Sequence, residues 1–120
     1  MIIISSQENG IILINNKYKE IICYFKNIKT NYLFIRNNND IIIKENILNK
    51  IQMNIYKFEK GEFKYKGILK DNITGRYIRL KENDNGKIFL IINQYNNRIT
   101  KVLIYDNNYN FEYSIDYLYN

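Results

Sequence analysis

Histidine, proline, tryptophan and alanine are all absent from this 120-residue chain, and cysteine occurs once. The lack of histidine excludes Ser-His-Asp and Cys-His catalytic arrangements and any histidine-ligated metal site. A single cysteine excludes an intramolecular disulfide and a metal cluster held by cysteines. That residue, Cys23, lies in the apolar run IICYF and is predicted to be a buried structural thiol. Most familiar hydrolase mechanisms are therefore closed to this chain.

The glycines and the carboxylates show no pattern of a nucleotide-binding or catalytic site. The five glycines form neither GxGxxG nor a P-loop, so a phosphate-binding loop is not predicted. The acidic residues fall mainly in predicted turns and on polar strand faces, where turn capping and solvation account for them. A histidine-free nuclease built from Arg, Lys, Tyr and Glu is the remaining enzyme alternative, and no spacing favours it. We therefore predict no enzyme activity and no cofactor.

Apolar and aromatic β-formers, separated by turns rich in asparagine and glycine, dominate the second half of the chain. From Gly61 onward the turn signals recur about every 11 or 12 residues, which is typical of strand plus turn in a meander. Partial alternation of apolar and polar residues predicts five consecutive strands there. Their predicted ranges are Phe63 to Lys70, Arg76 to Lys81, Lys87 to Asn93, Ile99 to Asp106 and Phe111 to Leu118.

The first half is less regular. It predicts strands at Ile2 to Ile4, Gly10 to Ile14, Glu20 to Lys26, Tyr32 to Arg36, Ile41 to Ile43 and Ile55 to Phe58. Residues 44–54 break the pattern, because Ile47, Leu48 and Ile51 form a helical stripe with glutamate early and lysine late. We therefore predict one short helix near residues 44–54. Elsewhere strands are favoured, since isoleucine lowers helix propensity and alanine is absent.

The length and the lack of any linker predict a single β-rich domain over residues 1–120. So many antiparallel strands in so few residues must curl or pack in two layers to cover their apolar faces. The predicted fold is mainly β, an antiparallel meander that closes into a small barrel or a two-sheet sandwich. No stretch approaches the ~18 apolar residues of a membrane span, and the N-terminal run MIII is too short for a signal segment. We expect a soluble, cytoplasmic protein.

Positive charge is concentrated in one part of the chain. The net charge is +6, and residues 57–81 contain eight basic residues against three acidic ones. If the two predicted strands of this region pair as a hairpin through Asp71 to Gly75, their polar faces fall on the same side of the sheet. The resulting basic patch consists of Lys64, Lys66, Lys70, Arg76, Tyr77, Arg79 and Lys81. The alternative is an ordinary solvated strand face on which lysine only maintains solubility.

Tyrosine gathers near the C-terminus and gives a second candidate binding surface, formed by Tyr105, Tyr109, Tyr113 and Tyr117. Tyrosine is enriched in protein interfaces because it offers a large contact area and one hydrogen-bonding group. The competing interpretation is that these rings pack at the edge and in the core of a sheet.

These features predict a non-enzymatic protein that binds a macromolecule. The favoured hypothesis is a small inhibitor or adaptor, comparable in size to phage anti-defence or toxin-immunity proteins, that docks on a nuclease or nucleoprotein. The alternative is a small basic β-barrel that binds single-stranded RNA or DNA directly, with lysine and arginine on the phosphates and Tyr77 stacked on a base. Neither hypothesis involves a membrane partner.

Overall fold

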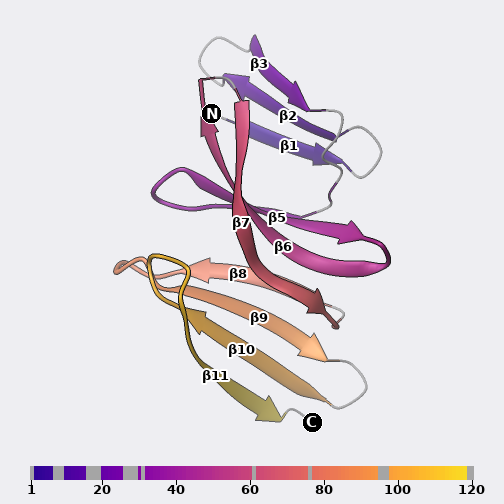
Figure 1. The fold of residues 1–120 in the computed structure, drawn as a ribbon, viewed down its shortest axis with the longest axis vertical. Coiled ribbons are helices and arrows are strands. Elements are labelled where there is room, and N and C mark those ends of the chain that lie inside the picture. The colour runs from indigo at the N-terminus through magenta and orange to yellow at the C-terminus, as the bar shows by residue number, and fades with distance from the viewer. Residues whose placement is uncertain are drawn as a thin grey trace. The chain divides into compact units, whose positions relative to one another are not determined.

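The computed structural model of the chain describes residues 2–6, 10–15, 20–25, 30, 32–60, 62–75, 77–94 and 98–118 (Figure 1). Every regular element in this part of the chain is a β-strand, and all strand pairing is antiparallel, which confirms the predicted mainly β class. The strands are β1 (Ile2–Ser6), β2 (Gly10–Asn15), β3 (Glu20–Phe25), β4 (Leu33–Ile35), β5 (Asp40–Ile47), β6 (Lys50–Glu59), β7 (Glu62–Ile73), β8 (Tyr77–Glu82), β9 (Ile88–Gln94), β10 (Ile99–Tyr105) and β11 (Phe111–Leu118).

The chain divides into two compact units, Met1–Asn72 and Ile73–Asn120. The first unit contains a three-stranded sheet of order β1-β2-β3 and a four-stranded sheet of order β4-β5-β6-β7. The second unit contains a four-stranded sheet of order β11-β10-β9-β8, which is a simple meander. Cys23 lies in β3, and its side chain is outside the described part of the structure. That the whole chain is one domain stays a prediction.

The core of the first unit lies at the centre of β5 and β6. Ile41 and Ile43 are buried on one face of β5, packed against Leu33 and the rings of Tyr56, Phe58 and Phe63. Ile42 between them is also fully buried, and so are Met53 and Ile55 of β6 on its side of the sheet. Burial on both faces explains why this segment reads as a continuous apolar run and not as an alternating one.

The helix predicted near residues 44–54 does not form. These residues are the end of β5, a two-residue turn at Leu48 and Asn49, and the start of β6. Both turn residues have positive φ, 52° and 63°, the combination that a type I′ hairpin turn requires. Leu48 is 90% exposed, so the apolar stripe that suggested a helix has no core to cover. The isoleucines favour the strands on either side of the turn.

This turn gives a direct test of the hairpin. The left-handed conformation is unfavourable for leucine by roughly 1–2 kcal/mol, whereas Asn-Gly is the preferred pair for a type I′ turn. We expect the double change Leu48→Asn with Asn49→Gly to raise the free energy of unfolding by about 1 kcal/mol, measured by urea denaturation. The matched control is Leu118→Asn, at an equally solvated leucine within a strand, for which no gain is expected. A loss of stability in the double variant would favour a helix, because glycine weakens helix interiors.

The sheet of the second unit has one face that is largely buried across strands β8, β9 and β10. Its buried residues come from β8, β9 and β10 and are each at most 7% exposed. Leu80, Leu90 and Leu103 lie directly opposite one another in a row across three strands. We call this side the leucine face. It comprises Ile78, Leu80, Ile88, Leu90, Ile92, Leu103 and Tyr105.

Two hairpins of this sheet close with turns of the same backbone geometry, as the Asn-rich sequence predicted. The Gly86 N–H donates to the Asn83 carbonyl at 3.0 Å, and the Tyr109 N–H donates to the Asp106 carbonyl at 3.1 Å. Gly86 and Tyr109 both have positive φ, 80° and 69°. A Cβ at Gly86 would also lie 2.5 Å from the Asn107 side chain, which would have to move to make room for it. The turns at the two hairpin ends are therefore neighbours.

A side chain fixes the turn that leads into β11. One carboxylate oxygen of Asp106 accepts the backbone N–H groups of Asn108 and Asn110, at 2.8 and 2.9 Å. The other accepts the Asn110 amide at 3.1 Å. The backbone and side-chain hydrogen bonds from Asn110 hold the pKa of the Asp106 carboxyl below its usual value. This network sets the direction in which β11 leaves the turn.

The closed barrel suggested by the strand count is not formed by the described residues. In each sheet the first and last strands do not pair with one another, so every sheet is open. The meander is interrupted where β7 ends at Ile73, because β8 pairs with β9 and not with β7. No helix of the described residues is long and apolar enough to cross a membrane.

Candidate functional site

The residues of the predicted basic patch lie on two separate sheets. Lys64, Lys66 and Lys70 are on β7 in the first unit, whereas Tyr77, Arg79 and Lys81 are on β8 in the second. The hairpin expected between these two strands is therefore absent, because each strand pairs with another neighbour. The turn signal of residues 72–75 marks the passage from one sheet to the next. Arg76 lies outside the described residues.

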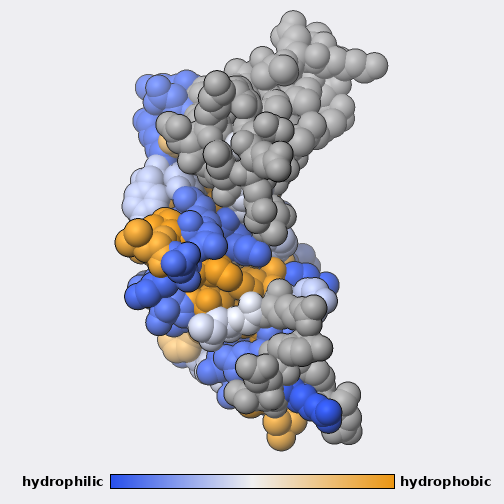
Figure 2. All heavy atoms as spheres, turned by 90° about the vertical axis from the view of Figure 1, so that its right-hand side faces the viewer, coloured by the Kyte–Doolittle hydropathy of each residue, from blue (hydrophilic) through white to orange (hydrophobic). Residues whose placement is uncertain are grey.

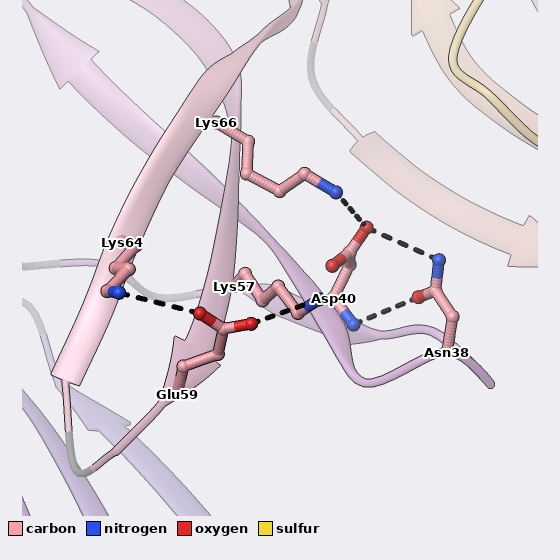
Figure 3. Close-up of polar contacts among 6 residues, drawn as sticks. All are labelled: Asn38, Asp40, Lys57, Glu59, Lys64 and Lys66. Atoms are coloured by element: carbon pink, nitrogen blue, oxygen red, sulfur yellow. Dashed lines mark hydrogen bonds and ion pairs between the residues drawn. The ribbon is translucent and has the colours of Figure 1, made fainter.

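Two of the three β7 lysines are engaged by carboxylates (Figure 3). The Lys66 Nζ lies 3.0 Å from the Asp40 Oδ2, and that aspartate is only 2% exposed. The Lys64 Nζ lies 3.5 Å from Glu59, whose other oxygen is 3.1 Å from the Lys57 Nζ. The lysine contacts hold the pKa of the Glu59 carboxyl below its usual value, the bond from Lys57 being the main cause. Lys64 and Lys66 thus have structural partners, and Lys70 is half-buried.

The three predicted residues of β8 form a regular exposed row. Tyr77, Arg79 and Lys81 are all solvent-exposed, while Ile78 and Leu80 between them are buried in the leucine face. Strand alternation produces this pattern, because successive side chains point to opposite faces of a sheet. The register then places Tyr77, Arg79 and Lys81 opposite Asn93, Ile91 and Phe89 of β9.

The same face continues across the whole sheet to β11. Residues directly opposite in an antiparallel pair share a face, so the register of β8, β9, β10 and β11 defines three parallel rows. We call this surface the tyrosine face. Its rows are Tyr77-Asn93-Thr100-Tyr117, Arg79-Ile91-Val102-Ile115 and Lys81-Phe89-Ile104-Tyr113. Predicted residues of the basic patch and of the aromatic surface therefore lie on one side of one sheet.

The tyrosine face is apolar in its middle and exposed along both edge strands. Tyr77, Tyr113 and Tyr117 are 58, 48 and 55% exposed, whereas the residues of β9 and β10 between them are partly or fully buried. Phe89 and Tyr113 flank Ile104 in their row. In the polar row the Thr100 hydroxyl and the Asn93 amide oxygen are hydrogen-bonded at 2.9 Å.

The charge of the tyrosine face has one sign. Arg79 and Lys81 are its only ionisable side chains besides the tyrosines, and none of its twelve residues carries a carboxylate. The acidic residues of β11 pair elsewhere, with Glu112 lying 3.1 Å from Lys87 and Asp116 lying 3.9 Å from Lys101. A positively charged rim on an aromatic surface therefore faces solvent. Figure 2, which draws one side of the molecule, shows apolar residues at the surface next to strongly hydrophilic ones.

The four tyrosines of the predicted aromatic surface divide between three places. Tyr113 and Tyr117 lie on the tyrosine face. Tyr105 is buried in the leucine face, with its ring 5.7 Å from that of Phe111 at the sheet edge, and burial raises the pKa of its hydroxyl to about 12. Tyr109 occupies the positive-φ position of the turn before β11. Tyr105 and Tyr109 thus have structural positions, and Tyr113 and Tyr117 remain as surface residues.

Sequence reasoning missed the apolar residues of this face, namely Phe89, Ile91, Val102, Ile104 and Ile115. Their signal was present, because each follows the alternation of its own strand. Their joint position depended on a detail of β11, where Tyr113 lies opposite Ile104 but Phe111 lies opposite Tyr105, so Glu112 is an extra residue in a bulge. A bulge changes which residues of a strand share a face. No residue type in β11 predicts a bulge at this position.

Outside this face, one polar pair stands out for its chemistry. The Tyr56 hydroxyl donates a hydrogen bond to the Glu45 carboxylate, and burial together with this bond raises the pKa of Tyr56. A tyrosine with a raised pKa holds its proton more firmly, so this pair serves packing better than proton transfer. The Tyr56 ring contacts Phe63 and Tyr65 edge-on, which fits a structural role.

The arrangement on the tyrosine face is suited to binding and presents no reactive constellation. Aromatic rings, aliphatic side chains and two cations can contact a partner but hold no group paired for nucleophilic attack or general acid–base work. Among the described residues, no group of three or more carboxylate, cysteine or histidine side chains is placed to hold a metal ion. Comparison of the chain with protein-family models, curated proteins and solved structures finds no match.

Proposed function

We propose that this chain is a non-enzymatic binding protein, a small inhibitor or adaptor that docks its tyrosine face on an acidic surface of a protein partner. The proposal rests on one observation: three exposed tyrosines share a sheet face with Arg79 and Lys81, and that face has no carboxylate. Tyrosine and arginine are the residue types that most often dominate binding energy in protein interfaces.

The balance of apolar and charged groups favours a protein partner. Five of the twelve positions are aliphatic or phenylalanine residues, and only two are cationic. A nucleic-acid surface relies on many phosphate contacts, and the engagement of Lys64 and Lys66 by Glu59 and Asp40 removes two of the cations on which such binding would depend. A half-apolar face with a cationic edge matches an interface core with a charged rim.

The charge of the face also indicates what the partner presents. A basic rim is complementary to a cluster of carboxylates, and nucleases that use metal ions carry such clusters in their active sites. An inhibitor that covers this cluster would block substrate without any chemistry of its own. We therefore propose a nuclease or a nucleoprotein as the class of partner.

The test is affinity capture from the cells of origin, with and without nuclease treatment, using the wild type and a charge-reversed variant. We expect a protein partner that survives nuclease treatment and whose affinity falls at least about tenfold in the double variant Arg79→Glu with Lys81→Glu. Both residues are exposed, so the fold should persist, which circular dichroism would verify.

The matched control reverses two lysines of the other unit. Lys50→Glu with Lys60→Glu changes the net charge by the same amount at two exposed positions far from β8 in the chain. Capture should be unaffected by this change. Equal losses in both double variants would show that only the net charge matters, and an undiminished capture by the β8 variant would exclude the tyrosine face as the docking site.

A second candidate function is direct binding of single-stranded nucleic acid on the same face. Tyr77 beside Arg79 and Lys81 is the observation in its favour, because aromatic rings stack on bases while the cations contact phosphates. The measurement is fluorescence anisotropy with a labelled oligothymidine and a labelled oligouridine at several salt concentrations. If this function is correct, reversal at Arg79 and Lys81 should reduce the slope of log K against log salt by at least about 1.4, that is ~0.7 for each lost phosphate contact.

A further inference from the structure

Strand β11 is an edge strand that has neither lysine nor proline, two common protections of such strands. It pairs with β10 on one side, and no strand of the described residues pairs with its other side (Figure 1). All eight of its residues are exposed, including Phe111, Tyr113, Ile115, Tyr117 and Leu118. Natural proteins shield such edges with charged residues, above all lysine, with proline, with bulges or with a covering element. β11 has a bulge at Glu112, but from Tyr113 to Leu118 its pairing with β10 is regular, and this stretch contains Asp116 as its one charged residue and neither lysine nor proline. An open apolar edge of this kind is a template for adding another strand.

We propose that β11 pairs with β11 of a second copy of this chain and forms a symmetric antiparallel dimer. In a two-fold antiparallel pair of this type, residues on one face of the first sheet lie opposite residues of the same face in the second. The two sheets would thereby join into one continuous sheet of eight strands. The proposal concerns the strand edge and does not depend on the proposed function.

The charges and apolar residues of β11 select one register. With the two-fold axis at Ile115, this residue faces its own copy and Tyr113 faces Tyr117 of the second copy, which gives three apolar cross-strand pairs. Ser114 then lies opposite Asp116 of the second copy, where its hydroxyl can donate to the carboxylate. An axis at Ser114 would place Glu112 directly opposite Asp116, and an axis at Asp116 would place this aspartate opposite itself. Both alternatives are disfavoured, because like charges directly opposite are destabilising. An axis at Tyr113 or at Tyr117 avoids such pairs but engages at most five residues of β11, against the seven residues 112–118 that pair about an axis at Ile115.

The remaining charges of the edge are already balanced within each copy. Glu112 is paired with Lys87 at 3.1 Å, and Asp116 faces Lys101 at 3.9 Å. Since no lysine or arginine lies on β11, the edge carries no cation that would repel its own copy. A single strand edge buries less than the roughly 1,200–2,000 Å² of stable interfaces, so we expect a dissociation constant in the micromolar range.

The test is sedimentation equilibrium of the purified full chain over a micromolar concentration series. We expect a reversible monomer–dimer equilibrium for the wild type, and a dissociation constant at least about tenfold higher for Ile115→Lys, which places two ammonium groups together at the axis. The variant Leu118→Lys is the matched control, because the proposed register sets this position opposite Glu112 of the second copy. It should retain the dimer or tighten it.

A second measurement keeps the proposal testable if Ile115→Lys folds poorly. Across an antiparallel pair the Cα atoms of directly opposed residues lie ~4.5–5.5 Å apart, within the range that a disulfide spans. Ile115→Cys should therefore form a covalent dimer on mild oxidation, whereas the wild type, with Cys23 alone, should not. A monomeric wild type at all concentrations, an Ile115→Lys variant that dimerises as well as the wild type, or dissociation by Leu118→Lys would each overturn the proposal.

Discussion

Replacing Lys66 with methionine should lower the free energy of unfolding by about 2–3 kcal/mol, measured by urea denaturation. The Asp40 side chain is 2% exposed and accepts the Lys66 ammonium at 3.0 Å. Methionine keeps most of the aliphatic length of lysine but removes the cation, so the carboxylate stays buried with a weaker set of partners. We expect a smaller loss than the ~3–5 kcal/mol for breaking a fully buried pair, because the Lys66 side chain is 42% exposed.

The neighbouring lysine on the same strand provides the control. Lys64 lies two residues before Lys66 and pairs with Glu59, but both side chains of that pair are well exposed and 3.5 Å apart. Lys64→Met should therefore change stability by less than about 1 kcal/mol. Asp40→Asn in the Lys66→Met background should recover part of the loss, because an amide is cheaper to bury than a charge. Equal losses for the two lysines would show that burial of Asp40 does not matter.

The strands were predictable because local residue patterns determine them. The five strands foreseen after Gly61 match β7 to β11 within a few residues at each end, since alternating apolar residues and Asn-rich turns define both. The helix prediction failed at Leu48, where the spacing of three apolar residues fitted a helix and a hairpin equally well. Only the turn, with its two positive φ values, distinguishes the two structures.

The pairing between strands was harder to predict from the sequence than the positions of the strands. The expected hairpin between the strands now described as β7 and β8 assumed that sequence neighbours pair, but β7 pairs with β6 and β8 with β9. The sequence predicts Lys64 and Lys66 as members of a basic patch, whereas in the structure Glu59 and Asp40 bind them from other strands. Arg79, Lys81 and Tyr77 were correctly placed on one face of their strand. Their position on the same face as Tyr113 and Tyr117 follows only from the register of three strand pairs. That register could not be predicted from the composition.

Buried and exposed leucines of the β8–β11 sheet should differ sharply in their tolerance of truncation. Leu90 is fully buried at the centre of the leucine face, between Leu80 and Leu103. Leu90→Ala removes apolar contacts and leaves a cavity that the two neighbouring strands cannot close, so we expect a loss of about 3–4 kcal/mol in the free energy of unfolding. Leu118→Ala is the same chemical change at a position 82% exposed, and it should cost less than about 0.5 kcal/mol.

The adjacent residue Ile91 turns this comparison into a test of the tyrosine face. Ile91 follows Leu90 in β9 but points to the opposite side, where it is only partly buried between Arg79 and Val102. Ile91→Ala should cost no more than about half of the Leu90→Ala loss, because the side chain it removes is still in contact with water. A loss as large as that of Leu90→Ala would mean that the tyrosine face is a second core surface. It would then have no apolar centre to offer a partner, and the proposed docking face would have to be abandoned even if Arg79 and Lys81 affect binding.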